Sequence, residues 1–219
     1  GSLFEGEGPE RRAYKLMNVQ AHVMLACDCK AAALLFLQNQ TSPAGDLPAY
    51  DHMFVDVREL INGRGRCFTH MGEHGEDHMC VVTQEIVDML IAGCSCKPCS
   101  IVRTGRRGDG GTVEHADFDL YEKYVDFLVA NTPNQSIFEN VFGFLKTCKA
   151  LKAPPIHWFL QRAIERSLGE IYDIRVILSN AKTRVAQSRR RVGSHSLMSA
   201  LVESSPGVVL RRITRPFVL

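Results

Sequence analysis

The residues best suited to chemistry gather between positions 67 and 99. The segment 67–80 reads CFTHMGEHGEDHMC, and the segment 94–99 reads CSCKPC. Cysteine sulfur and histidine nitrogen are the ligands that zinc prefers, usually four of them in a tetrahedral array. Because ligands that are close in sequence cost little entropy to bring together, we predict that this region binds zinc.

The preferred ligand set has two pairs. Cys96 and Cys99 have C-x-x-C spacing, and His78 and Cys80 form the upstream pair. A helix at 84–92 would lie between the pairs, so the ion would hold its two ends together. The sequence also leaves open a second choice of ligands, which comprises Cys67, His70, His74 and Cys94. The alternative to a metal is a group of free cysteines in a small apolar core, with solvated histidines.

A catalytic metal would use the same segment. His74 and His78 are four residues apart, but the metalloprotease motifs need Glu where this chain has Gly75 or Asp77. The deaminase signature, H-x-E followed by P-C-x-x-C, is met only in part, because the proline of CKPC lies inside the cysteine pair. We therefore predict a structural zinc with four closed positions. The alternative is a zinc-dependent hydrolase or deaminase with Glu76 as general acid/base.

The elements that must position these residues read mainly as helices. Apolar residues recur at helical spacing in several segments, which are 11–26, 30–40, 84–92, 119–131, 136–151, 156–168, 170–191 and 196–203. Alternation and β-forming residues predict short strands at 52–57, 100–104 and 112–118. The predicted fold class is mainly α, a helical domain with a few short strands and a zinc-stabilised, Cys/His-rich N-terminal half.

The chain divides into four predicted regions. Residues 1–10 resemble a tag remnant or a disordered leader, and we set them aside. A Cys/His-rich zinc-binding region covers 11–117, a helical region with a basic surface covers 118–205, and an extended tail covers 206–219. The alternative is one continuous domain from 11 to 219. Neither G-x-x-x-x-G-K-[ST] nor G-x-G-x-x-G occurs, so no nucleotide fingerprint is visible.

Charge is distributed unevenly along the chain. The net charge of the chain is +2, but residues 150–219 carry twelve Lys and Arg against four Asp and Glu, a net of +8. We predict that this basic part binds nucleic acid, a protein partner or both. The residues expected to do so are Arg175, Lys182, Arg184, Arg189, Arg190, Arg191, Arg211, Arg212 and Arg215. The alternative is that they face the acidic part of the same chain or of a second copy.

Bulk composition limits the function classes. Hydrophobic residues make up 45% of the 219 residues, which excludes disorder of the whole chain. No apolar run reaches the roughly 18–20 residues of a membrane span. Eight cysteines clustered with histidines favour a reducing compartment, the cytoplasm or the nucleus. The predicted function is that of a non-enzymatic, zinc-binding regulatory or scaffold protein, whose apolar tail docks on a partner or a second copy.

Overall fold

The computed structural model describes residues 1–4, 9–40, 50–60, 62–75, 77–82, 87–99, 115–148, 152–169, 171–180 and 196–204. Its helices are α1 (Pro9–Leu16), α2 (Ala31–Gln40), α3 (Val57–Leu60), α4 (Phe68–His74), α6 (Asp119–Asn131) and α7 (Ile156–Leu168), with 3₁₀ turns η1 (Lys97–Cys99), η2 (Ala116–Phe118) and η3 (Phe142–Leu145). Its strands are β1 (Ser2–Leu3), β2 (Val23–Cys27), β3 (Tyr50–Phe54), β4 (Arg64–Arg66), β5 (Met79–Val81), β6 (Met89–Ala92), β7 (Gln135–Val141), β8 (Tyr172–Asn180) and β9 (Ser196–Ser204). Within these ranges, no helix combines the length and the apolar character that crossing a membrane would need.

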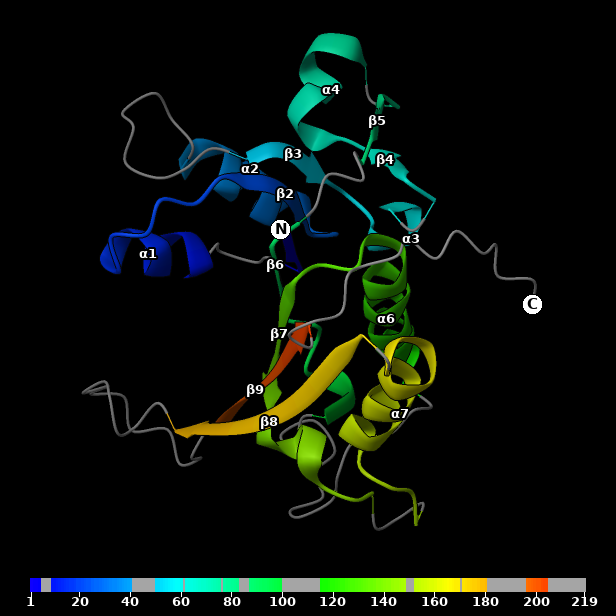
Figure 1. The fold of residues 1–219 in the computed structure, drawn as a ribbon. Helices are drawn as coiled ribbons and strands as arrows, with labels where there is room; N and C mark the ends of the chain where they lie inside the picture. The colour runs from blue at the N-terminus through cyan, green and yellow to red at the C-terminus, as the bar shows by residue number, and fades with distance from the viewer. Residues whose placement is uncertain are drawn as a thin grey trace, which may run out of the picture.

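Seven strands form one sheet in the order β3-β2-β1-β6-β7-β9-β8 (Figure 1). The first five lie parallel to one another, and β9 lies antiparallel to both β7 and β8. Strands β4 and β5 form a separate antiparallel pair. Parallel neighbours need crossover connections, and helices cover both faces of the sheet. The protein is therefore an α/β protein with a doubly wound sheet, and the predicted mainly α fold is wrong.

Strand β1 lies inside the sheet, between β2 and β6. Its Leu3 is fully buried. Residues 1–10 resemble a tag remnant or a disordered leader, and a two-residue strand is too short to show any periodicity that would indicate otherwise. Strands from both sides of the predicted boundary at 117/118 join the same sheet.

Several predicted helices contain strands instead. Part of 84–92 forms β6, part of 136–151 forms β7, 170–191 contains β8, and 196–203 falls within β9. In β7 the buried residues Ser136, Phe138 and Asn140 alternate with half-buried ones. A strand that is covered on both faces lacks a clear polar/apolar alternation, so its apolar residues also fit a helical spacing. For β8 and β9, pairing along nine residues each outweighs the local pattern.

Two other predicted segments also differ. The helix predicted at 11–26 ends at Leu16, because Asn18 adopts a left-handed conformation with φ of 54°, and β2 follows. Residues 116–118, predicted as part of a strand, form η2. The strand predicted at 100–104 lies outside the described residues. The helices predicted at 30–40, 119–131 and 156–168 correspond to α2, α6 and α7, and the strand predicted at 52–57 overlaps β3.

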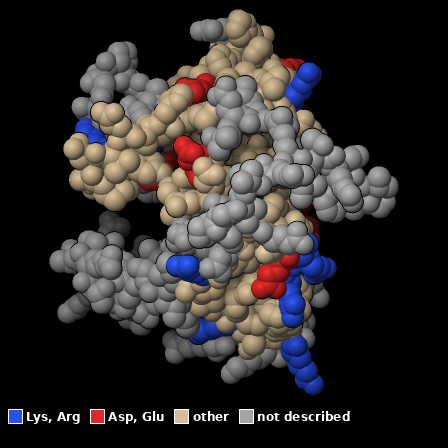
Figure 2. All heavy atoms as spheres, in the orientation of Figure 1, with Lys and Arg blue, Asp and Glu red and all other residues tan. Residues whose placement is uncertain are grey.

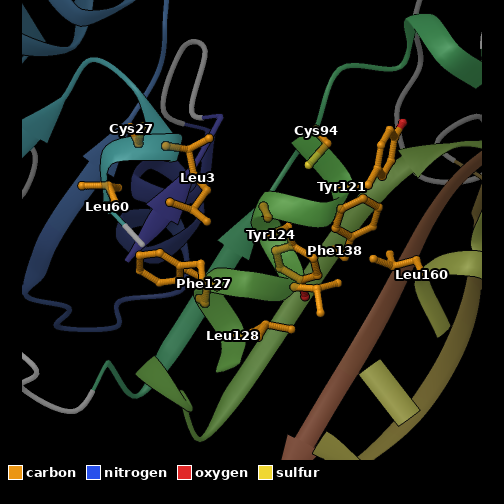
Figure 3. Packing of buried hydrophobic residues seen from close by; sticks show 14 of the residues in the cluster. Leu3, Cys27, Leu60, Cys94, Tyr121, Tyr124, Phe127, Leu128, Phe138 and Leu160 are labelled. Carbon is orange, nitrogen blue, oxygen red and sulfur yellow. The ribbon is translucent and has the colours of Figure 1, made fainter. Parts of the chain in front are cut away.

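The larger hydrophobic core lies between the sheet and the helices α6 and α7. In Figure 3, Tyr124, Phe127 and Leu128 of α6 pack toward the strands that carry Leu3 and Phe138. A smaller core on the other face packs α2 against β2 and β3. The parallel strands are thus fixed from both faces, which holds the loops at their carboxyl ends in place.

Candidate functional site

The carboxyl ends of the parallel strands form the first candidate site. In a doubly wound sheet, ligands bind where consecutive connections leave toward opposite sides of the sheet. Here β1 is followed by β2 and β3 on one side, whereas β6 and β7 lie on the other. This switch point lies between β1 and β6. The segments that leave these two strands begin at Phe4 and Gly93.

The segment after β1 has features of a ligand-binding connection, although it matches neither of the two nucleotide-binding motifs. Phe4 has φ of 60°, a left-handed conformation that is costly for a bulky residue and is often found at functional sites. Residues 5–8, which lie outside the described residues, read Glu-Gly-Glu-Gly, and α1 begins at Pro9. A glycine-rich connection between a strand and a helix lets a ligand approach the backbone closely. With only two glycines, it does not match the three-glycine motif.

Carboxylates follow the next two strands. Asp28 directly follows β2, and Asp56 comes soon after β3. The Lys30 amide donates to Asp28 Oδ1 at 2.8 Å, and the Arg58 amide donates to Asp56 Oδ1 at 2.9 Å. These local bonds orient both side chains. An acidic residue about 20 positions after the glycine-rich turn is the usual acceptor for a ribose hydroxyl, and Asp28 stands at that separation.

Three cysteines follow β6, and their environments differ. Cys94 and Cys99 are buried, whereas Cys96 is exposed. The Cys94 thiol lies 3.7 Å from the Leu120 carbonyl, and the Cys99 sulfur lies 3.3 Å from the Tyr121 hydroxyl. Burial raises the pKa of the Cys94 thiol well above its ordinary value and that of Cys99 to about 12. Among the three cysteines that follow β6, Cys96 is therefore the one whose thiol a substrate can reach.

The backbone around Cys96 is held by a buried network. Tyr121 donates its hydroxyl hydrogen to the Ser95 carbonyl at 2.8 Å, and Asn140 Nδ2 donates to the Tyr121 oxygen at 3.0 Å. The Ser95 hydroxyl donates to Asp117 Oδ2 at 2.7 Å, and this hydrogen bond is the main reason that the pKa of Asp117 is lowered. The turn after β6 is thus fixed by α6, β7 and η2.

A carboxyl group faces the switch point from β7. A Cβ added at Gly93 would lie 3.7 Å from Glu139 Oε2 and 3.9 Å from the Phe4 carbonyl oxygen, so these residues meet at one place. Burial raises the pKa of Glu139 above its ordinary value. A carboxyl group with a raised pKa can hold and deliver a proton closer to neutral pH. Sequence reasoning did not single out Glu139, because a strand Glu carries no motif.

A second candidate site is a Cys/His cluster beside β3. It consists of His52 on β3, Cys67 directly before α4, His70 in α4 and Cys80 on β5. One ligand atom from each residue lies within 4.8 Å of the other three. His70 Nδ1 lies 3.2 Å from Cys67 Sγ and 3.3 Å from Cys80 Sγ, and His52 Nδ1 lies 3.6 Å from Cys67 Sγ. These four residues, called the Cys/His cluster below, could hold a metal ion.

The cluster differs from both predicted ligand sets. Only Cys80 comes from the preferred set, and Cys67 and His70 come from the second choice. His52 was missed because it lies 15 residues before Cys67 on a separate strand. Of the remaining predicted ligands, His74 and His78 lie beside the cluster, with their ring centroids 4.6 Å apart. Cys94, Cys96 and Cys99 follow β6 instead.

The predicted basic surface falls largely outside the described residues. Arg175 is exposed on β8. The other predicted contact residues, Lys182, Arg184, Arg189, Arg190, Arg191, Arg211, Arg212 and Arg215, lie outside the described ranges, as does the tail at 206–219. Where the chain is described, Lys and Arg stand beside Asp and Glu on the visible face (Figure 2), as in the pairs Lys123–Asp126 and Arg162–Glu165.

Comparison with known proteins identifies the fold but no family. No family model and no curated protein matches the sequence. Among solved structures, the chain resembles an E. coli prophage protein provisionally described as a DNA modification methyltransferase. The TM-score is 0.55 at 15% sequence identity, and the match covers 93% of this chain but 45% of that protein. This chain thus spans less than half of the length of its structural neighbour.

The likeness corrects the predicted function. The prediction of a non-enzymatic, zinc-binding regulatory or scaffold protein rested on the Cys/His segment and the basic C-terminal part, whereas the observed fold is similar to that of a protein described as an enzyme. The alternative, a zinc hydrolase or deaminase based on Glu76, is not retained either, because the fold is similar to that of a protein described as a methyltransferase; Glu76 itself lies outside the described residues. At this identity the comparison establishes the fold alone, which is an α/β fold similar to that of the methyltransferase-like neighbour.

Proposed function

We propose that this chain is the catalytic part of a methyltransferase that transfers a methyl group from S-adenosylmethionine to a ring carbon of a pyrimidine base in DNA. The observation that carries this proposal is that an exposed thiol, Cys96, follows β6, while Glu139, whose pKa is raised by burial, lies near the carboxyl end of the adjacent parallel strand β7. The fold likeness supports methyl transfer as the reaction class.

The residues at the switch point fit an adenosyl cofactor. Asp28 and Asp56 offer oriented carboxylates for hydroxyl or amino hydrogens. The absence of a side chain at Gly93 keeps open the space between Glu139 and Phe4. When bound, S-adenosylmethionine supplies a methyl group on a positively charged sulfur, which a carbon nucleophile can accept.

An exposed cysteine is needed for a ring carbon but not for an amino group. Carbon 5 of cytosine is a weak nucleophile until carbon 6 forms a bond to a thiolate. In the proposed reaction the Cys96 thiolate adds to carbon 6, while Glu139 gives a proton to nitrogen 3. After carbon 5 has accepted the methyl group, it loses its hydrogen as a proton, the bond from sulfur to carbon 6 breaks, and Glu139 recovers its proton. The base gains one methyl group, S-adenosylhomocysteine is left behind, and the proton from carbon 5 passes to water.

DNA is the proposed partner, and its target base must leave the stack to reach Cys96. Arg175 and the basic residues that follow it in sequence are the proposed phosphate contacts, and binding through them would weaken steeply as salt rises. A DNA substrate agrees with the predicted location in the cytoplasm or the nucleus. Docking of the tail at 206–219 on a protein partner or a second copy stays a prediction.

The test is methyl transfer from tritiated S-adenosylmethionine to unmethylated DNA of mixed sequence. Cys96→Ser is expected to abolish transfer but to keep cofactor binding in equilibrium dialysis. The matched control is Cys29→Ser, which removes another exposed thiol at the same edge of the sheet and should keep activity. DNA containing 5-fluorocytosine should form a covalent complex with the wild type only, because fluorine cannot leave as the hydrogen does. Full activity of Cys96→Ser, or a wild type that neither binds the cofactor nor transfers methyl groups, would refute the proposal.

We infer zinc as the metal for the Cys/His cluster, because two thiolates and two imidazoles suit zinc far better than magnesium or calcium. This site takes no part in the proposed methyl transfer.

A further inference from the structure

We propose that His52, Cys67, His70 and Cys80 bind one zinc ion in a closed structural site, which fastens α4 and β5 to the carboxyl end of β3. The site is independent of the proposed methyl transfer, since none of its four residues is among those assigned to that reaction.

The distances between ligand atoms match a tetrahedral ion. With zinc–nitrogen bonds of about 2.0 Å and zinc–sulfur bonds of about 2.3 Å, tetrahedral angles separate neighbouring ligand atoms by roughly 3.3–3.8 Å. Three of the four sulfur–nitrogen distances are 3.2, 3.3 and 3.6 Å, and every pair of ligand atoms lies within 4.8 Å. The four side chains therefore need only small adjustments to coordinate one ion.

Hydrogen bonding alone accounts poorly for this arrangement. His70 Nδ1 lies within 3.3 Å of both Cys67 Sγ and Cys80 Sγ. One imidazole nitrogen has either a single hydrogen or a single lone pair along its ring plane, so it can form a well-directed bond with only one of the two sulfurs. A shared metal ion, in contrast, draws both sulfurs and the nitrogen toward the same point.

Burial and ligand count indicate a structural ion. Cys67 is fully buried, Cys80 is 9% exposed, and both histidines are half-buried. Four protein ligands fill the tetrahedral positions, whereas catalytic zinc keeps one position for water or substrate. No position is then left for chemistry on the metal.

The elements that the ion would join are too short to be stable alone. Strands β4 and β5 have three residues each, and an isolated two-stranded sheet is marginal in water. On β5, the side chains of Met79 and Val81 are 45% and 54% exposed, so this strand buries little apolar surface. The amide of Met53 donates to Thr69 Oγ1, and the amide of Cys67 donates to the His78 carbonyl. A metal bond between β3, α4 and β5 supplies the stability that this small region lacks.

Metal content gives a direct test on the whole chain. The protein, purified without chelator, should contain one zinc per chain by native mass spectrometry, and Cys80→Ser and His52→Ala should each lose it. His78→Ala is the matched control, because its ring lies beside the cluster without being a ligand, and it should keep the ion. Cys29→Ser, at an exposed cysteine elsewhere, should also keep it.

Measurements on the wild type test the site even if the variants fail to fold. Replacement of zinc by Co²⁺ should give the strong visible absorption of a tetrahedral ion and a thiolate-to-metal charge-transfer band, and X-ray absorption should find two sulfur and two nitrogen neighbours. A wild type that takes up neither zinc nor Co²⁺, or an ion that is lost in His78→Ala but kept in His52→Ala, would overturn the site. None of these readouts depends on methyl transfer, so they separate this site from the proposed function.

Discussion

Tyr121→Phe should remove the hydrogen bond that holds the turn carrying Cys96, without leaving a cavity in the core. The ring of Tyr121 is buried between Phe138 and Phe144, and phenylalanine would keep those contacts. The change removes only the hydroxyl, which donates to the Ser95 carbonyl and accepts from Asn140.

The expected loss of stability follows from the groups left without partners. A buried polar group that loses its hydrogen bond costs about 1–3 kcal/mol. Asn140 Nδ2 keeps a longer contact of 3.5 Å to the Cys94 carbonyl, which limits its share. We therefore expect the free energy of unfolding to fall by about 2 kcal/mol. Because the Ser95 carbonyl directly precedes Cys96, we expect kcat for methyl transfer to fall about tenfold, which corresponds to about 1.4 kcal/mol of transition-state stabilisation.

Tyr124→Phe is the matched control on the same helix. Its hydroxyl is also buried and lies 2.8 Å from the Ser136 hydroxyl, but this bond does not support the Cys96 turn. Ser136 also donates to the Leu90 carbonyl, so the control should lose only about 1 kcal/mol of stability and keep its kcat. The measurements are urea unfolding followed by circular dichroism and initial rates with saturating cofactor. Equal kcat values for the two variants would refute the supporting role of Tyr121.

Two further perturbations test the core and the proposed acid. Phe138→Ala removes a fully buried ring that contacts Tyr121, Tyr124 and Phe144, and we expect urea unfolding to show a loss of about 3–5 kcal/mol; a loss under about 1 kcal/mol would contradict the packing. For Glu139, the folded chain binds the proton more tightly than the unfolded chain, because burial raises the pKa. Its contribution to stability is therefore present at low pH and is lost as the pH rises from the ordinary glutamate value through the raised pKa. Glu139→Gln should remove this pH dependence from the unfolding free energy and lower methyl transfer; an unchanged pH profile would show that Glu139 is not buried as described.

Helices with one buried and one exposed face could be predicted from the sequence. In α7 the buried residues Ile156, Leu160, Ile164 and Leu168 follow the helical repeat, and its exposed residues are polar except for Trp158. The strands β7, β8 and β9 could not be predicted in this way. Strand β7 is covered on both faces, and long-range pairing decides β8 and β9, so their local sequence fits either a helix or a strand.

The sequence predicted that cysteine and histidine ligands would form a metal site, but it did not identify the right four residues. The segment 67–80 supplies three members of the Cys/His cluster, yet the fourth, His52, is brought in by β3. The C-x-x-C spacing suggested that Cys96 and Cys99 share an ion. Instead, η1 buries the Cys99 sulfur against Tyr121 and leaves Cys96 exposed. Asp28 and Glu139 become candidate site residues only when the strand order is known, and the strand order cannot be predicted from the residues next to them in sequence.

The fold separates thiols that would otherwise compete for the same chemistry. A reactive thiolate must be accessible and must not be bound by a metal. Cys67 and Cys80 are held with two histidines in the Cys/His cluster, where an ion would take up their lone pairs. Burial keeps the pKa of Cys27, Cys94 and Cys99 high, so these thiols stay protonated and unreactive. Cys96, exposed on a turn fixed by Tyr121 and Asn140, then remains free to act as a nucleophile at the switch point. Burial or the cluster thus reduces the reactivity of Cys27, Cys67, Cys80, Cys94 and Cys99, whereas Cys29 is exposed like Cys96. Cys96 differs from Cys29 because its turn is held by Tyr121 through the Ser95 carbonyl, next to the switch point.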